Sequence, residues 1–299
     1  MRVLVTGATG FIGRHLVRAL MERGDAVTVF VRESKNIPAG VTVIQGDIGD
    51  GKSLEQAAEG CEVIFHLAVV LRPDSSADAA EAKLDAEGMK NICDAAVARG
   101  IKKIIFASTS AVYGDAHQDE DVTEDLPASP VTIYAQSKRE AEVKLAALWK
   151  EHGIGSVSMR LFNIYGPGQD ARMVIPRFVQ NAKKGEPLVI NGDGTQIRDF
   201  VFVRDAVQAM ILLAEKSAGA EIVNIASGRG TSINDLAKTI KTITQSSSEI
   251  VHRALPAERK GIDVARRVGS TTKLQKISGY CPEMTVEEGL RVCAIVPAT

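Results

Sequence analysis

Apolar positions in the first two-thirds of the chain fall into short runs rich in β-branched residues. The runs predict strands at 2–6, 26–31, 41–45, 63–68, 103–108 and 157–162, and the segments between them predict helices near 11–23, 52–59, 78–99 and 131–151. Strands that alternate with helices form right-handed crossovers and a parallel sheet. The strands are apolar almost throughout, as burial on both faces requires. The pattern therefore predicts an α/β chain built on a doubly wound parallel sheet.

The character of the sequence changes after Asn163. Segments rich in Gly, Asp and Arg surround a short helix predicted at 174–184, and a strand-helix-strand unit is predicted within 200–225, before a helix from about 231 and a less regular tail. We expect a first domain over 1–165, to which 200–226 returns, and a smaller C-terminal lobe over 166–299. Ser129 and Pro130 are predicted to be the cap and the first-turn residue of the helix near 131–151.

The composition is that of an ordinary globular protein: of 299 residues, 45% are hydrophobic and 24% are charged. The net charge of −1 argues against a general binding surface for nucleic acid or anionic membrane. No apolar run is long enough to span a bilayer, and the first residues hold no extended apolar signal region. We therefore expect a cytoplasmic protein with neither a nucleic-acid nor a membrane partner.

The cysteines predict neither a disulfide framework nor a metal site. They are scattered without a C-x-x-C pair, at Cys61, Cys93, Cys281 and Cys293. All four are expected to pack as small hydrophobic side chains.

A glycine motif lies between the first strand and the first helix. In "VTGATGFIG", Gly7, Gly10 and Gly13 follow the spacing GxxGxxG. Glycine allows a tight turn and lets backbone N–H groups approach a pyrophosphate, which the helix N-terminus also attracts. The motif predicts that the first domain binds a dinucleotide in a Rossmann fold and leaves substrate binding to the C-terminal lobe.

The end of the second strand bears on the choice between NAD and NADP. An acid at this place accepts hydrogen bonds from the ribose hydroxyls, whereas an Arg accommodates a 2′-phosphate. The sequence reads Val31, Arg32, Glu33, which tips the prediction slightly towards NADP. Asp47, after the third strand, is a candidate acceptor for the adenine amino group or else a turn cap.

Three further residues form a candidate catalytic set. Tyr134 and Lys138 are four positions apart in a predicted helix, so they share one face. Thr109 ends the fifth strand, where ligands bind in parallel sheets. A phenol ionises near pKa ~10, but an ammonium and a positive nicotinamide ring both favour the phenolate. Tyr134 could then move the hydroxyl proton that an alcohol must lose when it gives up a hydride.

The ordered motifs "STSAVYG", "YAQSK", "RLFNIYGP" and "RDFVFVRD" give the chain a resemblance to the extended short-chain dehydrogenase/reductase family. Within it, the chain resembles nucleotide-sugar epimerases and dehydratases of the UDP-glucose 4-epimerase type. The resemblance implies that Tyr134 is the acid/base, that Lys138 lowers its pKa and binds the nicotinamide ribose, and that Thr109 polarises the substrate.

The resemblance also implies the binding residues. It assigns a nucleotide-diphosphate sugar to Asn163, Arg198 and Arg259, and a homodimer to the helices near 85–99 and 131–151. The cofactor contacts that we predict in full are Gly7, Gly10, Phe11, Ile12, Gly13, Arg32, Asp47, Ile48, Leu67, Ala68, Tyr134 and Lys138.

Residues beside the candidate set separate the possible reactions. Family dehydratases carry an Asp-Glu pair after the Thr, and family decarboxylases carry a Glu two places after it, whereas this chain has Ser110 and Ala111. The first hypothesis is therefore a 4-epimerase that works through a 4-keto sugar. The alternatives are an NADPH-dependent ketoreductase or dehydrogenase and, third, a non-catalytic dinucleotide-binding regulatory protein.

Other positions depart from the pattern of the family or are candidates for a role in the site. Asp85 replaces a frequent Asn, and the apolar run Val69, Val70, Leu71 could reshape the sugar pocket. His66 precedes the ligand-facing strand end, so we interpret it as a packed or cofactor-flanking residue.

Overall fold

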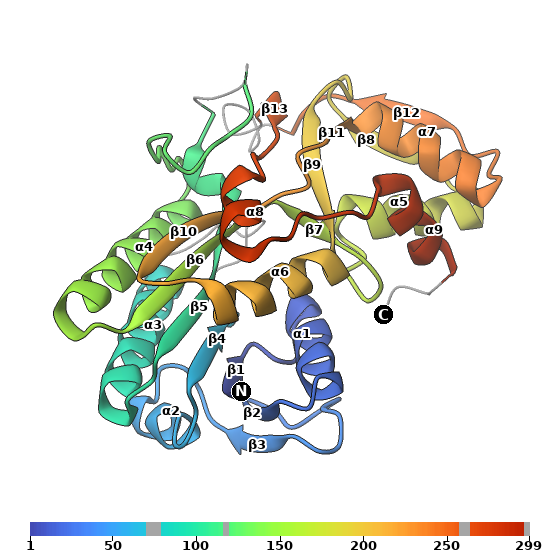
Figure 1. Cartoon of the computed structure of the whole chain (residues 1–299). Helices are drawn as coiled ribbons and strands as arrows, with labels where there is room; N and C mark the ends of the chain where they lie inside the picture. The colour runs from blue at the N-terminus through green and yellow to red at the C-terminus, as the bar shows by residue number, and fades with distance from the viewer. Residues whose placement is uncertain (70–78, 116–119, 257–263, 296–299) are drawn as a thin grey trace.

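A seven-stranded parallel sheet forms the centre of the molecule (Figure 1). The computed structural model describes residues 1–69, 79–115, 120–256 and 264–295. The strand order is β10-β6-β5-β4-β1-β2-β3, which changes direction at β1 as in a doubly wound fold. The strands are β1 (Arg2–Thr6), β2 (Ala26–Val31), β3 (Thr42–Gln45), β4 (Val63–His66), β5 (Lys103–Thr109), β6 (Gly155–Leu161) and β10 (Ala220–Ile225). The predicted fold class is confirmed.

Helices cover both faces of this sheet because alternate strand residues point to opposite sides. Val3 and Val5 belong to one buried cluster, whereas Leu4 belongs to another. The helices on the side of Val3 are α1 (Phe11–Glu22), α6 (Val203–Lys216) and α8 (Thr272–Ser278). Those on the side of Leu4 are α2 (Gly51–Ala57), α3 (Ala79–Arg99) and α4 (Ile133–His152).

The C-terminal lobe has a hydrophobic cluster of its own, which includes Phe178, Phe200 and Leu236. Two small sheets build it, β11-β9-β13 with β7 beside β9, and β12-β8. Its elements are β7 (Asn163–Tyr165), α5 (Val174–Lys184), β8 (Leu188–Asn191), β9 (Ile197–Phe202), β11 (Gly230–Ser232), α7 (Ile233–Thr244), β12 (Ile250–Arg253), β13 (Arg266–Arg267) and α9 (Val286–Ile295). The predicted domain boundaries stay a prediction, but β10 and α6 do pack with the large sheet.

A buried carboxylate ties this lobe to the end of the large sheet. Asp199, on β9, is fully buried and accepts hydrogen bonds from Ser227 N and Oγ, Gly228 N and Gly269 N at 2.7–3.2 Å. Its own carbonyl oxygen accepts a bond from Asn163 Nδ2 at 2.9 Å. The four donors offset part of the cost of burying the charge, although burial still raises the pKa of Asp199. Asp199 therefore fixes β9, and with it the neighbouring Arg198, against the large sheet.

The start of α4 differs from the prediction. Thr132 is the N-cap, since its side chain accepts a hydrogen bond from Ala135 N at 3.1 Å, and the helix begins at Ile133. Ser129 lies before the helix and donates its N–H to the Val112 carbonyl. The expectation for Ser129 and Pro130 was therefore wrong, because a second hydroxyl residue closer to the helix takes the capping position.

Candidate active site

The glycine turn brings β1, α1 and β4 close together. Gly7 has φ +72°, and a Cβ on it would lie 2.6 Å from Ala68 N. A Cβ on Gly13 would lie 2.1 Å from the Gly7 carbonyl oxygen. Gly10 caps α1 without a side chain, so the first N–H groups of the helix are available to an anion. The local geometry suits a pyrophosphate.

A pocket of about 640 Å³ opens beside this turn, at the carboxyl edge of the sheet. Seven predicted cofactor residues line it: Gly7, Gly10, Arg32, Asp47, Ile48, Leu67 and Ala68. Six other lining residues were not among the predicted cofactor contacts: Thr9, Phe30, Val31, Gly46, Val69 and Glu81. A Cβ on Gly46 would lie 2.7 Å from the Phe30 ring, so these two positions are coupled in size. Phe30 is on β2 and Gly46 follows β3, so their contact depends on strand pairing and has no local sequence signal.

In a doubly wound fold the adenosine of a dinucleotide lies beside the residues after the second and third strands, so the residues after β2 and β3 are the predicted adenosine end of this pocket. The Arg32 carbonyl oxygen accepts a bond from Gln45 Nε2 at 2.8 Å, and Arg32 itself is exposed. Glu33 pairs with Lys35 at 2.8 Å, with both side chains mostly exposed. Asp47 Oδ1 accepts Gly49 N at 2.9 Å, which is the turn cap that we had kept as an alternative role.

Thr109, Tyr134 and Lys138 come together from β5 and α4. The Thr109 hydroxyl hydrogen-bonds the Tyr134 phenol. Lys138 Nζ lies 5.8 Å from the centroid of the Tyr134 ring and 4.7 Å from that of Phe106. Lys138 is 5% exposed, which is unusual for a lysine and excludes an incidental surface role.

Burial sets the electrostatics of this cluster. Burial raises the pKa of Tyr134 to about 12. The Asp85 charge raises this pKa further, whereas the hydrogen bond from Thr109 lowers it. Burial lowers the pKa of Lys138 to about 8, and the Asp85 charge opposes this effect. The lowered phenol pKa that we expected from Lys138 is therefore not a property of the protein alone. A second positive charge, such as an oxidised nicotinamide ring, would have to supply it.

The predicted substrate residues have mixed outcomes. Asn163 faces β9 and donates to the Asp199 carbonyl oxygen. Arg198 Nη1 donates to the carbonyl oxygens of Ile197 and Val264 at 2.9 and 2.6 Å, so backbone oxygens already engage part of its guanidinium. Arg259 lies outside the described residues, as do Val70 and Leu71. Their binding roles stay predictions.

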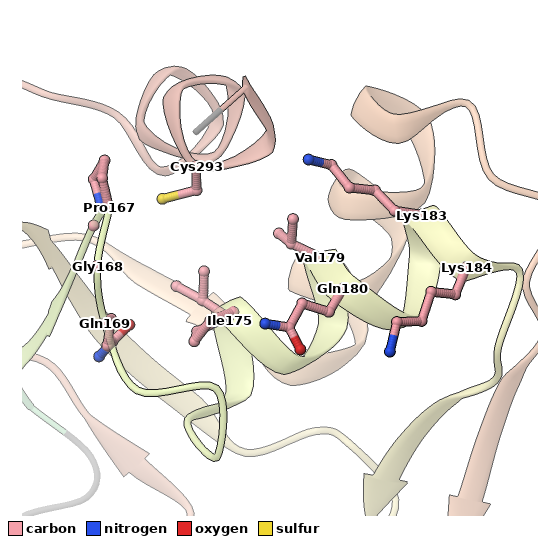
Figure 2. A pocket seen from close by; sticks show the side chains of 11 residues that line it. Pro167, Gly168, Gln169, Ile175, Val179, Gln180, Lys183, Lys184 and Cys293 are labelled. Carbon is pink, nitrogen blue, oxygen red and sulfur yellow. The ribbon is translucent and has the colours of Figure 1, made fainter. Parts of the chain in front are cut away.

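A second pocket, of about 200 Å³, lies between α5 and α9 and contains none of the predicted site residues (Figure 2). Ile175, Val179 and Cys293 form its apolar wall, and Lys183 and Lys184 lie at one end. It is separate from the Tyr134 cluster.

Other expected features can be checked in the described part of the chain. There, no cluster of His, Cys, Asp and Glu could hold a metal ion, and no helix could cross a membrane. All four cysteines are free thiols; Cys61, Cys93 and Cys293 are buried, whereas Cys281 is partly exposed.

Comparison with known proteins gives three close parallels. The UDP-N-acetyl-alpha-D-glucosaminuronate decarboxylase of Bacillus cytotoxicus is 35% identical over 97% of this chain and 95% of that protein. The UDP-glucose 4-epimerase of Thermotoga maritima, solved with UDP-glucose, matches with a TM-score of 0.90 at 32% identity, over 99% of this chain and 98% of that one. The UDP-glucose 4-epimerase of Thermus thermophilus, solved with NAD, matches with a TM-score of 0.89 at 29% identity, over 99% and 98% of the two chains.

The motifs, the sheet and these likenesses agree, and one family model spans most of the chain. That model matches residues 3–226 and thus includes the glycine turn, Thr109, Tyr134 and Lys138. The chain belongs to the NAD dependent epimerase/dehydratase family.

Proposed function

We propose that this protein is a nucleotide-sugar 4-epimerase. The observation that carries the proposal is the cluster of half-buried Thr109 and Tyr134 with buried Lys138, at the carboxyl edge of the sheet that also forms the dinucleotide pocket. The likeness to two UDP-glucose 4-epimerases supports the same reaction. We propose a nucleotide-diphosphate sugar as the substrate, bound by Asn163 and Arg198 of the C-terminal lobe and by Arg259, which lies outside the described residues.

In this proposal the chain moves one proton twice. An oxidised nicotinamide dinucleotide in the pocket that Gly7, Gly10 and Arg32 line would supply the hydride acceptor for carbon-4 of the sugar, and its reduced form would supply the hydride for the opposite face of the 4-keto sugar. Tyr134, as phenolate, takes the proton from the carbon-4 hydroxyl and gives it back in the return step. The Thr109 hydroxyl, which hydrogen-bonds Tyr134 in the free protein, has one proton and would turn it to the same sugar oxygen in the complex. Lys138 favours the phenolate while it carries its charge.

The residues after Thr109 favour epimerisation over the other reactions of the family. Ser110 and Ala111 begin the short helix η1 (Ser110–Tyr113), and the Thr109 hydroxyl accepts the Ala111 N–H at 3.2 Å. Neither side chain is a carboxylic acid, so neither can take a proton from a sugar carbon as dehydration requires. The 35% identical relative is named a decarboxylase, so decarboxylation is the competitor to exclude by experiment.

Product analysis without added cofactor tests the function. The purified protein is incubated with UDP-, GDP- and dTDP-hexoses and with UDP-hexuronic acids, and products are separated as intact nucleotide sugars. We expect a 4-epimer of at least one substrate, with no carbon dioxide released and no water lost. A strict need for added NADPH and a 4-keto substrate would identify the ketoreductase instead. Carbon dioxide release from a uronic acid would overturn the epimerase.

A second prediction concerns cofactor choice. Arg32 lines the dinucleotide pocket, and Val31 replaces the acid that would favour NAD. We expect NADP to bind at least as tightly as NAD. Arg32→Asp should weaken NADP about tenfold or more and spare NAD, because a charged hydrogen bond to the 2′-phosphate is lost. Titration calorimetry measures both, with Glu33→Gln as the matched neighbouring control. Unchanged NADP affinity in Arg32→Asp would refute the assignment.

We also propose a homodimer through α3 and α4. These helices pack side by side and leave apolar side chains exposed, namely Leu84 and Val97 on α3 and Val143 on α4. Exposed apolar side chains on two neighbouring helices favour an interface at this face. We expect sedimentation analysis to give twice the chain mass of 31.9 kDa. Val143→Glu should lower that mass to one chain, and a species of one chain in the unmodified protein would exclude the dimer.

A further inference from the structure

Four side chains form a row directly below the carboxyl edge of the sheet. Thr6, His66 and Phe106 are register neighbours on β1, β4 and β5, so they point to the same face. The His66 and Phe106 rings stack with centroids 5.7 Å apart and an interplanar angle of 19°. Lys138 Nζ lies over the far side of this row, 4.7 Å from the Phe106 centroid. The row therefore connects the first strand of the dinucleotide site to the candidate catalytic lysine.

The hydrogen bonds around Thr6 favour one tautomer of His66. The Thr6 hydroxyl oxygen accepts the Ala68 N–H at 3.3 Å and lies 2.8 Å from His66 Nδ1. Thr6 is fully buried, and its hydroxyl proton needs an acceptor. Among the described contacts only His66 Nδ1 can serve. This direction of the bond makes Nδ1 the acceptor of the Thr6 hydroxyl proton and places the ring proton on Nε2.

The chain of bonds ends at the floor of the dinucleotide pocket. Leu67 and Ala68 line that pocket, and the turn at Gly7 comes so close that a Cβ there would meet Ala68 N. A shift of the Leu67–Ala68 backbone would therefore displace the glycine turn or leave a gap beneath it. Two bonds hold this backbone: Leu67 N donates to the Thr6 carbonyl oxygen at 3.2 Å, and Ala68 N donates to the Thr6 hydroxyl, which contacts His66.

The ring also has to stay uncharged. Burial, with a smaller contribution from the Lys138 charge, lowers the pKa of His66 to about 3. A neutral ring leaves Lys138 as the cation over Phe106. A protonated ring would lose the acceptor at Nδ1 and would repel Lys138.

We propose that His66 is a positioning residue for the cofactor: through Thr6 and Ala68 it holds the floor of the dinucleotide pocket, and its neutral ring supports Phe106 under Lys138. The inference rests on dinucleotide binding at this pocket and not on the sugar reaction. His66 takes no proton from substrate in this role.

Cofactor affinity, measured without sugar, tests the proposal. His66→Leu keeps much of the volume but removes the acceptor, and we expect it to raise the Kd for NAD and NADP about tenfold, since a buried hydroxyl proton loses its partner. His66→Asn places an oxygen acceptor near Nδ1 and should stay within about threefold of the unmodified protein. Thr6→Val removes the same hydrogen bond and also the acceptor of the Ala68 N–H, so it should weaken binding at least as much as His66→Leu. The Thr6→Val/His66→Leu double variant should bind no worse than Thr6→Val alone.

Each outcome decides the question. Rescue by Asn together with non-additivity of the double variant supports the positioning role, because a general loss of packing would give neither. If His66→Leu does not fold, Thr6→Val and His66→Asn carry the comparison alone. Unchanged affinity in Thr6→Val, or His66→Asn as weak as the Leu or Val variant, would overturn the proposal. Because no sugar is present, failure of the epimerase proposal would leave this result unaffected.

Discussion

Tyr134→Phe is expected to lower turnover of the nucleotide sugar by about 10²–10⁴-fold, the range that a positioned acid/base contributes. The substitution removes only the hydroxyl that bonds Thr109, so the ring stays beside Lys138. Dinucleotide affinity should change little, because Tyr134 is not among the residues that line the dinucleotide pocket. Steady-state turnover and cofactor titration on the same preparation check both parts.

Tyr280→Phe is the matched control for that result. Tyr280 also hydrogen-bonds a neighbour, Asp205, but it lies at the end of α8 and not at the cluster. Removal of its hydroxyl should leave turnover within a factor of about two, since it contacts no reacting group. Near-normal turnover by Tyr134→Phe, or an equal loss in both variants, would contradict the catalytic assignment of Tyr134.

The architecture could be predicted because its signals are local. β-branched runs and helical spacing located β1 and β2 to the residue and placed the other strands of the first six to within two residues at each end. The glycine spacing located the dinucleotide turn for the same reason, since Gly7, Gly10 and Gly13 act within one turn. Where local signals compete, prediction failed. Ser129 and Thr132 both have the hydroxyl side chain that N-caps prefer, and only the three-dimensional path of the chain makes Thr132 the N-cap of α4.

The electrostatics of the site could not be predicted because they depend on contacts distant in sequence. Spacing placed Lys138 beside Tyr134 but did not reveal that α3 brings Asp85 close enough to influence both groups. The engagement of Arg198 with the Val264 carbonyl oxygen, 66 positions away, has no sequence signal either. One missed residue did have a signal. Arg160 stands in the apolar strand "VSMRLF", and a charge in a buried strand requires a partner.

Glu142 is the ion-pair partner of Arg160. Of the substitutions considered, Glu142→Ala, which breaks this pair, should cost the most free energy of unfolding. Arg160 donates through Nε and Nη2 to the two Glu142 oxygens at 3.0 and 2.8 Å, and both side chains are at most 2% exposed. Ser108 adds a third bond to the carboxylate at 2.6 Å, and the Tyr113 ring lies 4.5 Å from the guanidinium carbon. Glu142→Ala leaves the arginine charge buried without its counter-charge. We expect a loss of about 3–5 kcal/mol in the free energy of unfolding, measured by urea titration.

Glu140→Ala is the matched control because Glu140 lies two positions away on the same helix and is exposed. It should change the free energy of unfolding by no more than about 0.5 kcal/mol. The double variant Glu142→Met/Arg160→Met separates the value of the pair from the cost of breaking it. It removes both charges and should lose less stability than Glu142→Ala, since well-packed apolar residues often replace a buried ion pair without loss. A Glu142→Ala loss as small as that of Glu140→Ala would mean that water reaches Arg160 in solution, and that the pair does not anchor α4 to β6.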